Sequence, residues 1–398
     1  MSSRSRWLIF LVSTPLVVFA AVGGLMGATR AQNQDSYPHL NVFLDVLNHI
    51  RVAYVEPVDT DKVMDGAMRG LIDSLDSSSA YLSPAEVKAI DAASGDAARN
   101  GAPLDAGDTG LVITRQTLLR VLAVRDGSPA AAAGLRTGDY IRDIDGKATR
   151  EISAYAGTRL LHGAPGSKVT VTVFRSNAAD TRDIVLTREV PKTDLVTSKK
   201  LPGGEGYVRV VAFEPGVAAK LRQQIDSLRQ SGASGVLIDV RGTAGGSIDE
   251  GISAARLFVK TGTLVSRVGR ADTDKTKITA GAGDGGLTLP VVVLIANGTS
   301  DAAEVFAAAL AGAHRAELVG QGTAGIAAEQ HLVRLPEGVG LWLTYQRYFG
   351  PDDQPIHERG LAPTVGVDEP FVNFDETPPS TDATLTKAID VLKGKKAA

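Results

Sequence analysis

The chain has 398 residues, 43% hydrophobic and 22% charged, which is enough for two or three domains that each bury a core. Its formal net charge of -3 does not provide the clustered basic surface of a nucleic-acid-binding domain, so we expect no nucleic-acid partner. The absence of cysteine excludes disulfides, a thiol nucleophile and a cysteine-ligated zinc site.

Residues 1–31 have the composition of an export segment. Arg4 and Arg6 precede an apolar run over residues 7–27, and small residues follow it. A basic start, an apolar run and small residues are typical of a secretory signal. The run is also long enough to cross a bilayer as a helix, so an uncleaved anchor stays open. Because the basic flank remains inside, both alternatives predict a periplasmic or otherwise extracytoplasmic protein, secreted or anchored to the inner membrane.

Residues 32–93 show the periodicity of helices. Leu40, Phe43, Leu44 and Leu47 recur at the spacing of one helix face, and Pro57 interrupts the pattern. The run Ser83-Pro84-Ala85-Glu86 predicts a helix start with a capping box. We expect this region to pack or dimerise, since nothing in it carries chemistry.

Residues 94–108 are small and polar and predict a linker, and residues 109–191 predict a β-rich unit. The run Ser-Pro-Ala to Gly-Leu-Arg-Thr-Gly-Asp over residues 128–139 resembles a PDZ domain. The resemblance implies that a peptide C-terminus adds as an extra strand and that backbone N–H groups hold its carboxylate. The positions implied for this role are Gly110, Leu111, Val112 and Ile113. Val112 replaces the usual second glycine, which is acceptable if its φ is negative.

Residues 200–370 alternate strands with helices, which predicts an α/β layered core. Apolar strands at 206–210, 235–240 and 289–296 alternate with helical patterns at 217–230 and 248–259. Residues 371–398 predict a tail with a short amphipathic helix. The whole chain is therefore expected to be an α/β multidomain protein.

A polar elbow at residues 297–301 separates an apolar strand from an alanine-rich helix. Such a turn places its last residue at the positive end of the helix, where enzymes often hold a nucleophile. Asp301 occupies that place, and with Glu304 it also predicts a capping box.

The order of these segments, over residues 40–394, resembles the C-terminal processing (tail-specific) serine peptidases. That family carries Ser-Ala-Ser-Ala-Ser-Glu at the elbow and Phe-Gly-Lys-Gly-x-x-Gln downstream, with a serine nucleophile and a lysine base, on a crotonase-like layered core. The resemblance places the nucleophile position on Asp301, the base on Ile326 and the glutamine on Gln330. It assigns the oxyanion turn to Gly245 and Gly246.

Both reacting groups of the family are therefore replaced. A carboxylate is a weak nucleophile toward an amide, isoleucine cannot accept a proton, and no lysine lies between Lys277 and Lys387. We predict a pseudopeptidase of the cell envelope that binds peptide C-termini or partner proteins through its PDZ domain. It could also associate with itself or with an active paralogue.

One alternative keeps a working peptidase. Ser300, one residue before the mapped position, would be the nucleophile, and the base would be a histidine, of which His331 is the one to test. The six histidines have no paired metal spacing, and the glycine run at 242–246 is not a phosphate loop, so we expect no metal and no cofactor.

Overall fold

The computed structural model describes residues 38–92, 106–175, 180–192, 194–370, 372–374, 376–377 and 379–397. The predicted export segment and residues 94–105 of the predicted linker lie outside these ranges. No helix within them is both long enough and apolar enough to cross a membrane. The chain divides into two units, Met1–Ala67 and Met68–Ala398, which are described separately.

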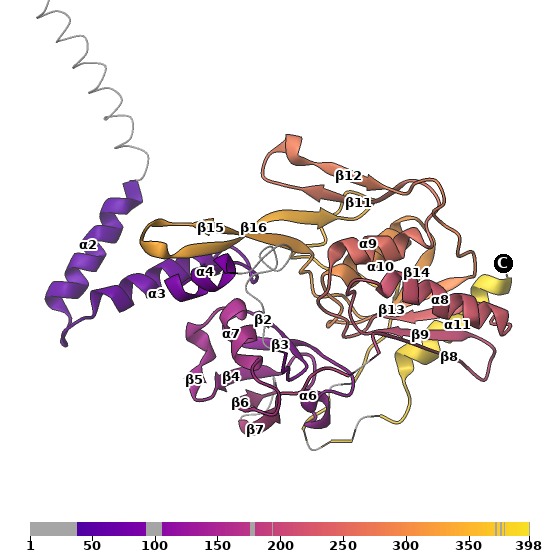
Figure 1. Ribbon diagram of the computed structural model, residues 1–398, viewed down its shortest axis with the longest axis horizontal. Coiled ribbons are helices and arrows are strands. Elements are labelled where there is room, and N and C mark those ends of the chain that lie inside the picture. The colour runs from indigo at the N-terminus through magenta and orange to yellow at the C-terminus, as the bar shows by residue number, and fades with distance from the viewer. Residues whose placement is uncertain are drawn as a thin grey trace, which may run out of the picture. The chain divides into compact units, whose positions relative to one another are not determined.

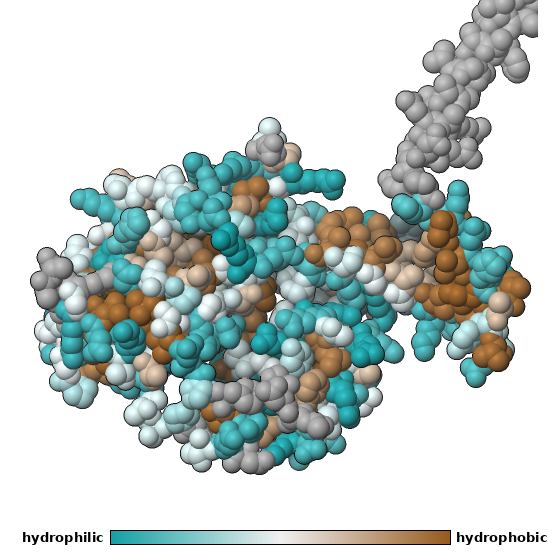
Figure 2. All heavy atoms as spheres, turned by 180° about the vertical axis from the view of Figure 1, so that it is seen from behind, coloured by the Kyte–Doolittle hydropathy of each residue, from teal (hydrophilic) through white to brown (hydrophobic). Residues whose placement is uncertain are grey.

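The described part of the first unit is helical. It contains α2 (Pro38–Ala53) and the start of α3 (Thr60–Asp73), and the predicted break at Pro57 lies between them. Leu40, Val42 and Val52 on α2 are 55%, 59% and 77% exposed, and Figure 2 shows hydrophobic surface on this helix. These apolar side chains of α2 are therefore largely exposed in the part of the chain that the structure describes.

In the second unit, α4 (Pro84–Asp91) begins with the predicted capping box, in which Ser83 and Glu86 exchange hydrogen bonds. The predicted helical region 32–93 also contains a short strand that the sequence did not indicate, β1 (Ala80–Leu82), which pairs antiparallel with β16 (Gly340–Phe349). This strand is three residues long, too short for a periodic signal, and it is held by pairing with residues about 260 positions away in sequence.

The predicted β-rich unit forms a sheet in the order β2-β3-β4-β6-β7, with β5 beside β4. Its strands are β2 (Leu111–Arg115), β3 (Leu119–Val124), β4 (Tyr140–Ile144), β5 (Lys147–Ala148), β6 (Lys168–Phe174) and β7 (Arg182–Thr187), and its helices are α6 (Pro129–Ala132) and α7 (Ala154–Leu161). Strand β2 is at the edge of this sheet, so one side of its backbone has no strand partner among the described residues.

The predicted α/β core is confirmed as a six-stranded sheet in the order β17-β14-β13-β10-β9-β8, parallel except for β8. Helices α8, α9 and α10 pack on one face, and α11 packs on the other (Figure 1). The strands are β8 (Val196–Lys200), β9 (Gly206–Val210), β10 (Val236–Asp239), β13 (Val291–Ile295), β14 (Ala316–Gly320) and β17 (Val365–Gly366). The helices are α8 (Val217–Gln230), α9 (Ile248–Arg256), α10 (Ala302–Gly312) and α11 (Ala383–Ala397).

A third sheet contains the long strand β16 in its interior. It joins β1, β16, β11 (Thr263–Val268) and β12 (Thr276–Thr279) in that order, and β15 (Ala328–Arg334) also pairs with β16 (Figure 1). The turn between β14 and β15 returns the chain to the elbow, since Ala324 N–H donates to the carbonyl of Thr299. The segments that the family resemblance brings together therefore meet in this fold.

Candidate active site

The elbow between β13 and α10 is fixed by hydrogen bonds to the end of β10 and the turn that follows it. Ser300 N–H donates to the carbonyl of Thr243 (3.0 Å), and Thr299 Oγ1 donates to the carbonyl of Val240 (2.8 Å). Gly298 has no room for a side chain, because a Cβ there would lie 2.6 Å from the carbonyl oxygen of Leu122. The backbone of the elbow is therefore held by hydrogen bonds and close packing with segments distant in sequence.

Asp301 occupies the tip of the elbow in a strained conformation. Its φ of 51° and ψ of -120° are unfavourable for a residue with a Cβ. Backbone strain of this kind costs about 1–3 kcal/mol and persists where the surroundings over-determine it, often at functional sites. The elbow therefore keeps the geometry that presents a side chain at the start of a helix, and the side chain presented is a carboxyl group.

The carboxyl group of Asp301 lies near two donors. Ser300 Oγ is 3.5 Å from Oδ2, and the backbone N–H of Gly245 also stabilises the carboxylate. Burial raises the pKa of Asp301 to about 6, although these two donors oppose the shift. Of the two glycines predicted for the oxyanion turn, Gly245 is thus the one that acts on Asp301.

Gly246, the second glycine of the predicted oxyanion turn, is needed for close packing. Its φ is 95°, and an added Cβ would lie 2.3 Å from the carbonyl oxygen of Phe213. Phe213 and Gly246 form a parallel bridge that ties the turn to the segment before α8. The need for glycine at this position is therefore steric.

The predicted capping box at Asp301 and Glu304 is wrong. Asp301 has no side-chain cap hydrogen bond, and its backbone is not in the extended region that an N-cap residue adopts. The Glu304 carboxylate instead accepts hydrogen bonds from Thr323 Oγ1 (2.5 Å) and from the N–H groups of Gly325 (2.7 Å) and Ile326 (2.8 Å). The strained backbone of Asp301 is thus incompatible with an N-cap. Glu304 bonds instead to the turn at residues 323–326.

Glu304 is fully buried beneath the elbow. Burial raises its pKa to about 7, and the nearby charge of Asp301 adds to the shift. Sequence reasoning used Glu304 as a capping residue and did not detect its contacts to residues 323–326, because only the folded chain brings the two segments together. Two carboxyl groups with raised pKa values therefore lie at one helix start.

Ile326 lies in an apolar cluster that covers the elbow. The cluster joins Val112, Leu122 and Ala123 of the β-rich unit to Ala244, Ala324 and Ile326 of the core. A lysine base in this family would need such an apolar environment to lower its pKa, but Ile326 has no titratable atom. The β2–β3 hairpin thus packs directly over the place where the family resemblance puts the base.

Gln330, the third position of the resemblance, lies on β15, and its amide nitrogen is 3.2 Å from Thr344 Oγ1 on β16. The hydrogen-bond partner of the Gln330 side chain is therefore the hydroxyl group of Thr344 on the neighbouring strand.

Ser300 is an unfavourable nucleophile in this geometry. Its residue has no exposed surface, and its backbone is tied to Thr243. His331 is exposed on β15, with its ring 4.6 Å from the ring of Tyr345. Among the described residues no hydrogen bond joins Ser300 to a histidine, so the structure gives the serine–histidine alternative no support.

The residues predicted to hold a peptide carboxylate lie at the start of strand β2. Gly110 precedes the strand and its N–H donates to Asp108 Oδ1 (2.8 Å), whereas Leu111, Val112 and Ile113 are already in the strand. Val112 is therefore extended, and its β-branched side chain is compatible with the position. Asp108 also pairs with Arg125, so a buried carboxylate already lies beside this loop.

The described residues hold no group of three or more His, Cys, Asp or Glu side chains that could bind a metal ion.

Comparisons with known proteins agree with this arrangement. Residues 204–367 match peptidase family S41, and residues 120–175 match a PDZ domain. The chain is 31% identical to the chloroplastic C-terminal processing peptidase of Tetradesmus obliquus, covering 80% of this chain and 71% of that protein. It is 28% identical to the carboxy-terminal-processing protease of Bartonella bacilliformis, covering 92% of this chain and 83% of that protein.

A solved structure of the photosystem II D1 C-terminal processing protease has a TM-score of 0.66 and 27% identity, covering 85% of this chain and 95% of that chain. The fold is thus that of a peptidase core with a PDZ domain. The chain belongs to the carboxyl-terminal processing proteases of peptidase family S41. The family predicted from the sequence is confirmed.

The two raised carboxyl pKa values predict a pH dependence of stability. Aspartate and glutamate in an unfolded chain titrate near pH 4, so between about pH 4 and about pH 7 the folded state binds more protons than the unfolded state. The free energy of unfolding contributed by these groups therefore falls as pH rises through that window. For Asp301 we expect a loss on the order of 2 kcal/mol.

Urea unfolding between about pH 4 and about pH 7 measures this effect, and Asp301→Asn should flatten the pH dependence. Asp180→Asn, which changes an exposed carboxyl group of the PDZ domain, is the matched control and should leave the dependence unaltered. Equal slopes for the wild type and Asp301→Asn would contradict the assignment of the raised pKa to Asp301.

Proposed function

We propose that this protein is a pseudopeptidase of the carboxyl-terminal processing family, which binds peptides or partner proteins without cleaving them. The observation that carries the proposal is the Asp301 carboxyl group at the elbow tip, where the family has its serine, near the backbone N–H of Gly245. By the family resemblance, that N–H would stabilise the oxyanion of an acyl-transfer reaction. A substrate carbonyl would find this donor already engaged by the protein.

The surroundings of Ile326 support the same proposal. A serine peptidase of this kind needs a neutral amine beside the nucleophile. The cluster of Val112, Leu122, Ala123 and Ala244 supplies apolar walls there, but no proton acceptor. The site thus combines the scaffold of a peptidase with side chains that cannot form or resolve an acyl-enzyme.

Treatment of the chain with a serine-directed fluorophosphonate tests the proposal. Protein lacking residues 1–31 should remain unlabelled and should not cleave unstructured peptides with free C-termini, whereas an active carboxyl-terminal processing protease assayed in parallel should do both. Labelling that disappears in Ser300→Ala would overturn the proposal and establish the serine alternative.

Peptide binding is assigned to the edge strand β2. Its open side allows an extended peptide to add as a further strand, and side-chain pockets would then give specificity. The negative charge of Asp108 should weaken capture of the peptide carboxylate. Asp108 is buried, is paired with Arg125, and lies at the point where that carboxylate would arrive. We therefore expect weak binding of apolar C-terminal peptides.

Fluorescence anisotropy with a labelled apolar tail peptide should give a saturable curve with the full chain. Asp108→Asn removes the negative charge near the loop and should tighten binding of the free-acid peptide by about threefold or more, since like charges repel. An amidated peptide should not respond to this substitution. The same gain for both peptides would contradict carboxylate capture at Gly110 to Ile113.

The apolar face of α2 supports association with a second copy of the chain or with a paralogous peptidase, since Leu40, Val42 and Val52 are exposed. The N-terminal sequence supports an envelope location, with membrane attachment if the segment is retained.

A further inference from the structure

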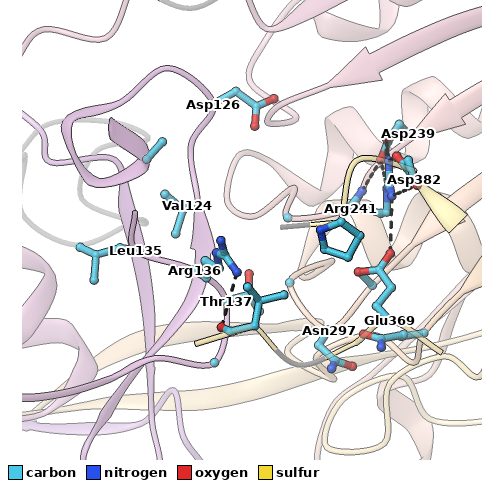
Figure 3. A pocket seen from close by; sticks show the side chains of 18 of the residues that line it. Val124, Asp126, Leu135, Arg136, Thr137, Asp239, Arg241, Asn297, Glu369 and Asp382 are labelled. Atoms are coloured by element: carbon cyan, nitrogen blue, oxygen red, sulfur yellow. Dashed lines mark hydrogen bonds and ion pairs between the residues drawn. The ribbon is translucent and has the colours of Figure 1, made fainter. Parts of the chain in front are cut away.

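A cavity of about 1530 Å³ lies beside the elbow, in addition to the site around Asp301 (Figure 3). Its floor is formed by residues 296–298 and by Arg241 and Gly242, at the carboxyl ends of β13 and β10. Ligands of α/β proteins bind outside the carboxyl ends of parallel strands, because the loops there are free to form a site. The PDZ residues 134–140 form one wall, and residues 379–383 before and at the start of α11 form another.

Every carboxylate that lines this cavity is already paired with an arginine. Asp139 accepts two bonds from Arg175 (2.6 and 2.9 Å), and Asp126 accepts one from Arg209 (2.9 Å). The remaining three carboxylates surround Arg241: Asp239 at 2.7 Å, Asp382 at 2.7 Å and Glu369 at 3.7 Å. Arg241 thus faces three carboxylates at once, and the whole lining contains six cations and five carboxylates, which leaves a net charge of +1.

The positive charge is not fully compensated. Arg120, Arg136 and Lys199 also line the cavity, and none of them forms an ion pair within 4 Å among the described residues, although Asp139 is near enough to attract the charge of Arg136. Arg136 has one long hydrogen bond, from Nη1 to the carbonyl of Val372 (3.5 Å). Arg120 has a buried Nε without a partner, and Lys199 lies 5.2 Å from the ring centre of Tyr207. These three side chains are therefore the lining cations that are left without an ion pair.

Uncharged donors lie near Arg136. Figure 3 shows Arg136, Thr137 and Asn297 close together around the cavity, and the Asn297 side chain is exposed, with no hydrogen bond to the described residues. A guanidinium beside amide and hydroxyl donors suits a carboxylate. Arg120 lies on β3, Arg136 in the loop that follows α6, and Lys199 on β8. Because these cations come from different elements, they suit carboxylates that are spaced along an extended ligand.

We propose that this cavity is a second peptide site, which binds the carboxylates of an acidic, extended peptide segment. Its volume exceeds that of most small-molecule pockets and matches a chain of several residues. The site goes beyond the binding of an apolar tail at β2, and it does not depend on that function.

The probe is a fluorescein-labelled peptide rich in glutamate, with an amidated C-terminus, titrated against protein lacking residues 1–31 at low and at high salt. We expect saturable binding that weakens with salt and is absent for the same peptide with glutamine in place of glutamate. Arg136→Ala should weaken binding about tenfold or more, since one charge-assisted contact is lost. Arg136→Lys should recover part of the loss.

Arg142→Ala is the matched control, because Arg142 is an exposed arginine of the same domain that does not line the cavity. Lys199→Ala provides a second, independent test at a lining residue on β8. Equal affinity for the glutamate and glutamine peptides would overturn the proposal. Unchanged binding in both Arg136→Ala and Lys199→Ala, with unaltered thermal midpoints, would overturn it as well.

Two further arms separate this site from the one at β2. An excess of unlabelled apolar tail peptide should leave the acidic probe bound, whereas full displacement would overturn a separate site. A glutamine peptide with a free C-terminus tests the other source of a carboxylate. If it binds the cavity as tightly as the glutamate peptide, and Arg136→Ala weakens both equally, the inference of an acidic side-chain ligand is wrong.

Discussion

The double substitution Asp301→Ser with Ile326→Lys is expected to produce peptidase activity that the wild type and both single variants lack. The elbow would present the introduced serine at φ 51° and ψ -120°, and the Gly245 N–H would be released from the aspartate. The introduced lysine would enter the apolar cluster of Leu122, Ala123 and Ala244, where desolvation lowers the pKa of an amine and makes it a base. We expect cleavage at least about 10²-fold above either single variant, the lower end of general-base catalysis.

Hydrolysis of an unstructured peptide, together with fluorophosphonate labelling of the introduced serine, measures the outcome. Asp301→Ser alone should cost little stability, whereas Ile326→Lys should cost more because an amine replaces packed hydrocarbon. A folded double variant whose introduced side chains lie side by side and which is still inert would contradict the expectation. The rest of the site, including Thr243 and Ala244, would then have changed as well.

Glu304→Ala is expected to destabilise the protein by about 3–5 kcal/mol, because three buried donors lose their acceptor at once. These donors are Thr323 Oγ1 and the N–H groups of Gly325 and Ile326. They fix the turn that returns to the elbow, so the loss should also loosen the backbone around Ile326. Chemical unfolding measures the free energy, and hydrogen exchange at residues 323–326 measures the local effect.

Glu304→Gln retains a carbonyl acceptor and should lose less than half as much stability as the alanine variant. Glu214→Ala removes an exposed glutamate and is the control, for which we expect a change within about 0.5 kcal/mol. A loss of less than about 1 kcal/mol in Glu304→Ala would show that the three hydrogen bonds contribute little to the fold.

Local patterns predicted most elements of the α/β core from the sequence. Helix α8 was expected at 217–230 and runs over Val217–Gln230, and β9 was expected at 206–210 and runs over Gly206–Val210. In both elements the apolar periodicity and the nearby glycines indicate the same boundaries. Short elements such as β1 were missed, because their stability comes from a partner distant in sequence.

Two stretches with the same capping signal had different outcomes. Ser83 and Glu86 form the predicted capping box at a half-buried helix start, where their side chains bond to each other and to each other's backbone. Asp301 and Glu304 match the same pattern, but the elbow is held at positive φ, and Glu304 is buried against residues 323–326. A cap signal therefore predicts a cap only where tertiary contacts leave the side chains available.

The sequence by itself determined the family, the order of the domains' main elements, and the identity of the residues at positions 301 and 326, because these depend on local pattern and on motif spacing. The tertiary structure decided what those residues do. Burial raises the pKa of Asp301 against the opposing effect of the Gly245 N–H, and the β2–β3 hairpin encloses Ile326 in an apolar cluster. Such effects arise from groups far apart along the chain, so no local pattern contains them.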